Sequence, residues 1–322
     1  MSLYMAKVDP YLIAGCEIVL DVDLAVSGEL RHVSSAFLRH LLSVHSKTVL
    51  AFIHAETGVV PLYFRRLILA LRYLRYLLGL SEDHYARLAL EEAINLRINR
   101  APSWFGDLQR VLARLAPNLH IEGCSISEWR ITELIEAVEA TYLNGINNEI
   151  ESRVKGAIIR LSMKHISGVD GLHPRRKTIA RRAYLTTLIP AHRKALTRLF
   201  LSSHILAVEV LRWTERYRPK IPREWRLCRF CKVTVEDEVH ALLCCTIAPG
   251  LIELRRAFLA DADALCPNLA NAWGRLAVDD RLACLLQLPI LEPRLAQYVY
   301  HVLEIFGATP VYIPPQTLWS HS

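Results

Sequence analysis

Hydrophobic residues recur every three or four positions through most of this chain, a period typical of amphipathic helices. One such run follows Ser27, a residue that can cap a helix, and continues to Leu42; another extends from about Leu62, just after Pro61, to Gly79. Further helices are predicted from Ser81, from Trp104 to before Pro117, from Ser127 towards Lys164 with an interruption near Gly145 or Gly156, around Arg175, from Ala191 to about Arg216, and in two or three segments after residue 245. We therefore predict a mainly α fold with a region resembling a helical bundle.

One segment is a candidate strand. Leu12 to Leu20 is short and apolar, and Asp21-Val22-Asp23 follows it in alternation, which predicts a short N-terminal strand. Asp21 and Asp23 on one strand face could hold Mg²⁺, but they lack a third acidic partner nearby, so a polar strand end is the favoured interpretation. The sequence contains no glycine-rich phosphate loop, G-x-S-x-G elbow or H-E-x-x-H motif. We expect no catalytic residues and no enzyme activity.

The most specific chemistry lies in residues 228–245, which contain a C-x2-C-x8-H-x4-C pattern. Cys228 and Cys231 can lie on one tight knuckle with both sulfurs towards the same ion, and His240 with a cysteine at the end of a short helix can complete a tetrahedron. Thr234 can cap that helix. The pattern predicts one Zn²⁺ in a small zinc-knuckle module. Buried cysteines beside a surface histidine are the alternative.

The fourth zinc ligand is open between two neighbours. In an α-helix Cys244 would share a face with His240, four positions earlier. If the helix ends there, Cys245 can turn inward instead. Four protein ligands leave no open coordination position, so the site predicts a structural zinc rather than a hydrolase.

The amino-acid composition indicates what broad class of protein this is. Of the 322 residues 52% are hydrophobic, enough to bury a large core. Four cysteines outside residues 228–245 lie in apolar segments and are read as reduced core thiols: Cys16, Cys124, Cys266 and Cys284. The N-terminal residues lack a secretory signal, and charged residues interrupt every leucine-rich run. We expect an intracellular protein, nuclear or cytoplasmic, with no membrane partner.

Positive charge is concentrated in residues 152–208, which contain twelve basic residues and one acid, a net charge of +11. Because the whole chain carries +7, all other residues together carry −4. Clustered Lys and Arg favour a polyanion, RNA or DNA, through release of counterions from phosphates. The alternative is neutralisation by the glutamates between Glu128 and Glu151. The residues predicted to contact phosphates are Arg175, Arg176, Lys177, Arg181, Arg182, Arg193, Lys194 and Arg198.

Several motifs resemble one family. Residues 56–67, Glu-Thr-Gly-Val-Val-Pro-Leu-Tyr-Phe-Arg-Arg-Leu, are similar to the segment downstream of the polymerase core in non-LTR (LINE-type) retrotransposon reverse transcriptases. Residues 14–17 and 37–42 resemble the lead-in to that segment, residues 195–199 the helix before the knuckle, and residues 228–245 the C-terminal CCHC knuckle of the same polyproteins. In this family four residues separate the histidine from the last cysteine, which favours Cys245.

This resemblance implies a nucleic-acid-binding C-terminal fragment without the polymerase motif. It divides the chain into a remnant of the segment after the polymerase core (1–56), a basic helical region (57–218) and the knuckle with C-terminal helices (219–322). Trp213, Trp225 and Phe230 are candidates for stacking on bases, with packing around the metal as the alternative. A second hypothesis is a retroelement-derived host protein whose zinc knuckle binds other proteins.

Overall fold

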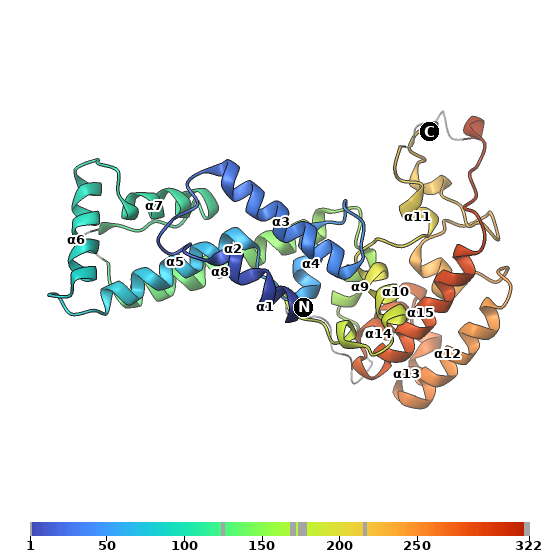
Figure 1. Ribbon diagram of the computed structural model, residues 1–322. Coiled ribbons are helices and arrows are strands. Elements are labelled where there is room, and N and C mark those ends of the chain that lie inside the picture. Colours follow the sequence, from blue (N-terminus) through green and yellow to red (C-terminus); the bar gives the residue numbers. More distant parts are fainter. Residues whose placement is uncertain (1, 124–125, 168–171, 173–178, 215–217, 319–322) are drawn as a thin grey trace. The chain divides into compact units, whose positions relative to one another are not determined.

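The computed structural model describes residues 2–123, 126–167, 172, 179–214 and 218–318 (Figure 1). Helices form nearly all of its regular structure. Within these ranges the β pairings are isolated bridges, between Thr57 and Arg181 and between Leu227 and Val235. The mainly α prediction is confirmed. No helix in the described ranges combines the length and the apolar composition needed to cross a membrane.

The chain forms two compact units, each assembled from two separate stretches. Unit 1 contains Met1–Leu41 and Gly58–Glu149, and unit 2 contains Leu42–Thr57 and Ile150–Ser322. Unit 2 carries 26 basic and 16 acidic residues, a net charge of +10, whereas unit 1 carries 13 basic and 16 acidic residues, a net charge of −3. The division into three consecutive regions stays a prediction.

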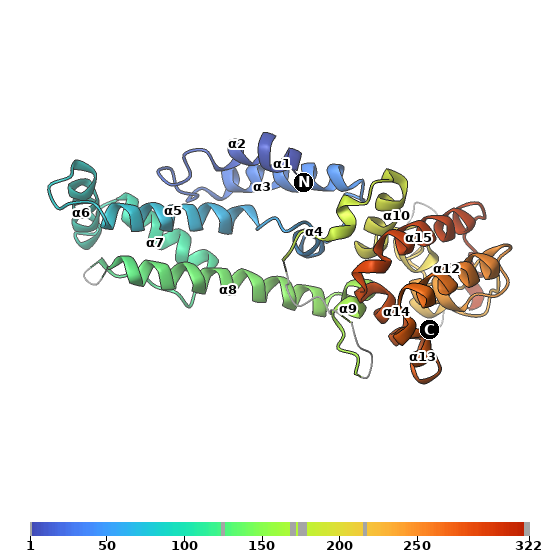
Figure 2. The same cartoon turned by 90° about the horizontal axis from the view of Figure 1, so that it is seen from below.

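Unit 1 is organised around two long antiparallel helices. The helices that begin in it are α1 (Ser2–Lys7), α2 (Asp9–Ile13), α3 (Leu24–Leu42), α5 (Leu62–Leu78), α6 (Tyr85–Ile98), α7 (Trp104–Leu115) and α8 (Glu128–Ser152). Helices α5 and α8 lie side by side (Figure 1, Figure 2). The Phe64 ring lies 5.4 Å from that of Tyr142, and Arg75 donates to Thr132 at 3.3 Å. The later residue of α5, Arg75, contacts the earlier residue of α8, Thr132. The two helices therefore run antiparallel.

The predicted N-terminal strand is wrong. Helix α2 occupies residues 9–13, and turns follow it, with Cys16 N donating to the Ile13 carbonyl and Ile18 N to the Gly15 carbonyl. Gly15 has φ +67°, a left-handed conformation that interrupts an extended run. A short apolar segment cannot be assigned to a strand by composition alone, because a short helix and the turns after it can have the same composition.

Two helices of this unit begin at a serine that caps them. Ser103 Oγ accepts from Gly106 N at the start of α7, and Ser127 Oγ accepts from Arg130 N at the start of α8. Helix α8 passes through Gly145 without a break and ends at Ser152, and Gly156, with φ +84°, directly precedes α9 (Ala157–Met163). Of the two predicted positions, only Gly156 lies in the interruption between helices.

Unit 2 holds the remaining helices. The α-helices are α4 (Leu50–Thr57), α9 (Ala157–Met163), α10 (Pro190–Phe200), α11 (Ala207–Val210), α12 (Leu251–Leu265), α13 (Pro267–Ala272), α14 (Val278–Gln287) and α15 (Glu292–Gly307). The short 3₁₀ turns are η2 (Ala183–Thr186), η3 (Arg223–Trp225), η5 (Trp273–Arg275), η6 (Pro289–Leu291) and η7 (Gln316–Leu318), and η4 (His240–Cys244) is a π turn. Helix α10 ends well before Arg216, because Ser202 takes a left-handed φ of +48°.

Helix α15 is at the centre of the unit 2 core. It packs against α10 and α12, and its Val299 and Val302 are fully buried. The Phe258 ring of α12 stacks on Tyr298 of α15 at 4.3 Å, and the Tyr298 hydroxyl donates to the carbonyl of Leu242 in η4. The core therefore continues directly into the segment that carries the predicted metal ligands.

Helix α4 contains the Glu-Thr of the family-like motif, and it is buried from Ala51 to Thr57. The fully buried carboxylate of Glu56 pairs with Arg182 at 3.3 Å and accepts a hydrogen bond from Tyr184 at 2.9 Å. Gly58, with φ +75°, supplies the left-handed turn after the helix. These contacts give the motif a structural role.

Candidate metal centre

The two cysteines of the C-x2-C pattern lie on a tight hairpin. Cys228 N donates to the Thr234 carbonyl and Lys232 N to the Cys228 carbonyl, both at 2.8 Å. Lys232 takes a left-handed φ of +56°, which reverses the chain directly after the second cysteine. The reversal brings both sulfurs to the same side of the knuckle, as the spacing predicts.

Burial and backbone N–H groups act in opposite directions on these thiols. Burial raises the pKa of Cys228 to about 12, although the N–H groups of Cys231 and Phe230 point towards its sulfur. For Cys231 burial also opposes ionisation, but the N–H groups of Thr234 and Val233, together with the Cys228 side chain and the N–H group of Cys231, lower the pKa. Such N–H groups stabilise thiolates, the form that binds metal.

His240 begins a π turn rather than an α-helical one. Asp237 Oδ1 accepts from His240 N at 2.9 Å and so caps the segment; the prediction that Thr234 caps it is wrong, because Thr234 belongs to the hairpin. Cys245 N donates to the His240 carbonyl at 2.8 Å, a bond between residues five apart. The wider turn places residue i+5, instead of i+4, beside residue i.

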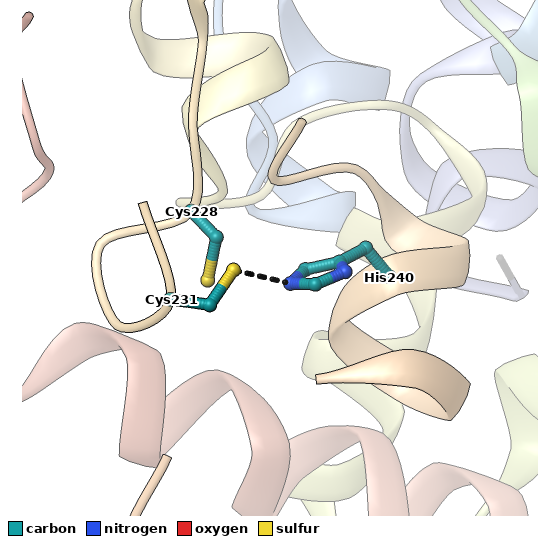
Figure 3. Close-up of side chains that lie close together, drawn as sticks. All are labelled: Cys228, Cys231 and His240. Atoms are coloured by element: carbon teal, nitrogen blue, oxygen red, sulfur yellow. Dashed lines mark hydrogen bonds between the residues drawn. The ribbon is translucent and has the colours of Figure 1, made fainter. Parts of the chain in front are cut away.

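The side chains of Cys228, Cys231 and His240 converge (Figure 3), and their ligand atoms all lie within 4.8 Å of one another. Cys231 Sγ lies 3.5 Å from His240 Nε2, and Cys245 Sγ lies 3.8 Å from Cys228 Sγ. Cys245 is buried whereas Cys244 is exposed. These residues, with Cys245 at the edge of the group, could bind a metal such as zinc.

Two separations among the four side chains are those expected around a tetrahedral ion. With Zn–S near 2.3 Å and Zn–N near 2.0 Å, ligand atoms at the tetrahedral angle are about 3.8 Å apart for two sulfurs and about 3.5 Å apart for sulfur and nitrogen. The Cys228–Cys245 and Cys231–His240 separations match these two edges. Burial lowers the pKa of His240, which favours the neutral imidazole that binds metal.

A buried ion pair fastens the knuckle to the rest of unit 2. Arg229, between the two cysteines, pairs with Glu236 at 2.6 Å, and both side chains are almost fully buried. Arg229 also donates to the carbonyls of Ile205 and Thr309, at 2.9 and 2.6 Å, and to that of Phe306. Because all these groups are hydrogen-bonded, the pair fixes the position of the knuckle beside the C-terminal end of α15.

Two further contacts support the turn that carries His240. Arg255 of α12 donates to the carbonyls of Leu242 and Cys245, each at 2.9 Å. His204 lies 3.1 Å from Glu238, both buried. Burial disfavours ionised Glu238, but the hydrogen bond and charge of His204 outweigh it and lower the pKa of this carboxyl. Sequence reasoning missed Arg229, Glu236 and Arg255; a charged residue inside the C-x2-C spacing was the available signal.

The predicted phosphate-binding residues take different positions. Arg175, Arg176 and Lys177 lie outside the described residues, while Arg181 and Lys194 are exposed. The other three make internal contacts: Arg182 with Glu56, Arg193 with the Thr187 carbonyl at 2.8 Å, and Arg198 with the Ser43 carbonyl at 3.1 Å.

Three other cations of the basic segment also make contacts within unit 2. Lys155 pairs with Glu209 at 3.2 Å, Lys164 pairs with Asp280, and Arg160 donates to three backbone carbonyls. Part of the basic segment therefore stabilises the fold of unit 2.

The three aromatic candidates for base stacking differ in how far they are packed against other side chains. Phe230 meets Phe306 edge to face at 5.1 Å, and Trp225 packs against the cluster of Ala207, Leu211 and Ile221. Both rings therefore pack against apolar side chains of unit 2. Trp213 is 37% exposed.

Asp21 and Asp23 have structural contacts. Asp21 accepts two hydrogen bonds from Arg66 Nε, at 2.8 and 3.0 Å, and Asp23 Oδ1 caps α3 by accepting from Ala25 N at 2.7 Å. An arginine-paired carboxylate and a helix cap explain both residues without a bound cation.

Comparison of the chain with models of protein families, with curated proteins and with solved structures finds no match. The likeness to LINE-type reverse transcriptases therefore rests on the motifs alone.

Proposed function

We propose that this chain is a non-catalytic, nucleic-acid-binding segment of retroelement type, in which a structural Zn²⁺ on Cys228, Cys231, His240 and Cys245 stabilises a basic unit. The observation that carries the proposal is the separation of charge: unit 2, which contains the metal centre, has a net charge of +10, and unit 1 has −3. Phosphates of RNA or DNA are the partner that such a surplus favours.

The zinc supports this function through folding. Four protein ligands leave no position for a water or a substrate, so the ion holds the hairpin and the π turn together. Phosphate contacts then come from the cations that the fold leaves exposed. Such contacts position the nucleic acid without reading its bases.

The test is the salt dependence of binding to a 20-nucleotide single-stranded RNA. The variant replaces Arg175, Arg176, Lys177 and Arg181 with Gln and spares Arg182, whose loss would remove the cation that pairs with the buried Glu56 carboxylate. Each lost phosphate contact reduces the log–log salt slope by about 0.7. We expect the variant slope to be shallower by about two to three units.

The matched control removes four exposed arginines of unit 1: Arg72, Arg100, Arg110 and Arg130. Its slope should stay within about half a unit of the parent. Equal slopes for the parent and the unit 2 variant would refute the phosphate contacts, and a parent that binds no RNA at low salt would refute the function.

A further inference from the structure

Trp213 is surrounded by cations. Lys47 Nζ lies 4.7 Å from the centre of its ring, Lys155 Nζ 4.8 Å, and Arg212 Cζ 5.5 Å. All three are within the distance at which the ring quadrupole attracts a cation. An exposed indole among several cations combines the two groups that single-stranded nucleic acids use, a stacking face and phosphate partners.

Two of these cations are held in place by one carboxylate. Glu209 pairs with Lys155 at 3.2 Å and with Arg212 at 3.1 Å, and its side chain is 9% exposed. Lys47, Lys155, Arg212 and Glu209 together carry a net charge of +2. Burial lowers the pKa of Lys155, although Glu209 opposes the shift. Arg212 and Lys47 are more exposed than Lys155 and are therefore the cations of this cluster that a phosphate can reach.

Lys47 reaches the ring from an anchored loop. His45 N donates to Ser203 Oγ at 2.9 Å, Thr48 N donates to the His45 carbonyl at 2.9 Å, and Thr48 is buried. The backbone of residues 45–48 is thus fixed beside the end of α10. The Lys47 side chain itself is exposed, so its ammonium group can move from the ring to a phosphate.

We propose, on the basis of the nucleic-acid function above, that Trp213 with Lys47 and Arg212 is a binding site for one nucleotide of a single strand. The base stacks on the indole, and the two cations contact its flanking phosphates. A duplex keeps its bases stacked internally, so the site favours unpaired RNA or DNA.

The experiment compares three 12-nucleotide ligands on the zinc-loaded full chain: oligo-uridine, a strand of the same length whose central positions are abasic, and a duplex. The parent should bind the abasic strand more weakly than oligo-uridine. Trp213→Ala should weaken oligo-uridine binding about 5- to 150-fold, the effect of losing one stacked base. It should change binding of the abasic strand and the duplex less than about twofold.

Two control variants isolate stacking from folding. Trp213→Phe keeps a ring and should retain most of the preference for bases. Trp129→Ala removes an indole of unit 1 that is 66% exposed and should bind as the parent does. Circular dichroism checks that each variant is folded.

The outcomes are distinguishable. A parent that binds oligo-uridine while Trp213→Ala binds it equally well, or loses affinity for all three ligands alike, overturns the stacking site and leaves the proposed function standing. A parent that binds none of the three overturns both.

Discussion

At the scale of single residues, the positions of Cys244 and Cys245 decide which of them can be the fourth protein ligand of the metal centre. Cys245 Sγ lies 3.8 Å from Cys228 Sγ and is buried, whereas Cys244 is exposed. Cys245 is therefore the neighbour that lies close to Cys228, Cys231 and His240, the three residues that could hold a metal ion.

Cys245→Ser should therefore lose zinc and Cys244→Ser should retain it. Structural zinc binding contributes about 10–16 kcal/mol over four ligands, so removing one ligand should weaken affinity roughly a hundredfold or more. Metal content after dialysis against a weak chelator measures both variants. Zinc retained by Cys245→Ser and lost by Cys244→Ser would assign the opposite ligand.

Residue spacing predicted the grouping of Cys228, Cys231 and His240, but it did not decide between Cys244 and Cys245 as the fourth ligand. Two cysteines on a knuckle and a histidine on a helix follow from C-x2-C-x8-H, whereas the choice between neighbours depends on the π turn, which hydrophobic periodicity does not reveal. The pairing of Arg182 with Glu56 spans 126 positions, and no local pattern could separate Arg182 from the exposed Arg181.

At the scale of elements, two glycines that looked equivalent in sequence have opposite roles. Gly145 lies inside α8, and a Cβ added there would meet no atom within 4 Å. Gly156 lies directly before α9 and has a left-handed φ of +84°. A Cβ at Gly156 would come within 2.5 Å of Phe52 Cζ. Helix continuity thus depends on backbone conformation and close packing.

Gly145→Ala should stabilise unit 1 by about 0.5–1 kcal/mol, because alanine is the better helix former. Gly156→Ala should destabilise unit 2 by about 2 kcal/mol or more, through the left-handed conformation and the contact with Phe52. Urea unfolding measures both free energies. Similar values for the two substitutions would contradict this assignment of the helix break.

The α7 and α8 helices were predictable because their apolar period and serine caps agree, and α5 was predictable because its apolar period begins directly after Pro61. Two predictions show the limit of this reasoning: the strand at residues 12–20, and a helix from Ala191 to about Arg216 where α10 ends at Phe200. In both places a residue with positive φ, Gly15 or Ser202, ends the regular structure.

At the scale of the whole molecule, the metal centre belongs to one unit only. Its hairpin is joined to α15 through Arg229, and its π turn to α12 through Arg255 and to α15 through Tyr298. Since metal binding contributes to folding, removal of the ion should loosen these connections and leave the helices of unit 1 unaffected.

Chelation should therefore accelerate amide hydrogen exchange about tenfold or more in residues 204–245 and in α15. Exchange in α5, α7 and the first four turns of α8 should stay unchanged. Re-addition of zinc should restore protection. Uniform acceleration over both units would show that the ion stabilises the molecule as a whole.

The discontinuous assembly of unit 2 has a consequence for synthesis on the ribosome. Helix α4 is apolar and buried in the finished unit, yet Arg182 and Tyr184, which satisfy its Glu56, are translated more than 120 residues after it. At about 5–20 residues per second this is a delay of roughly 6–25 s. During that interval the nascent chain presents an unprotected hydrophobic segment, the kind of surface that chaperones bind.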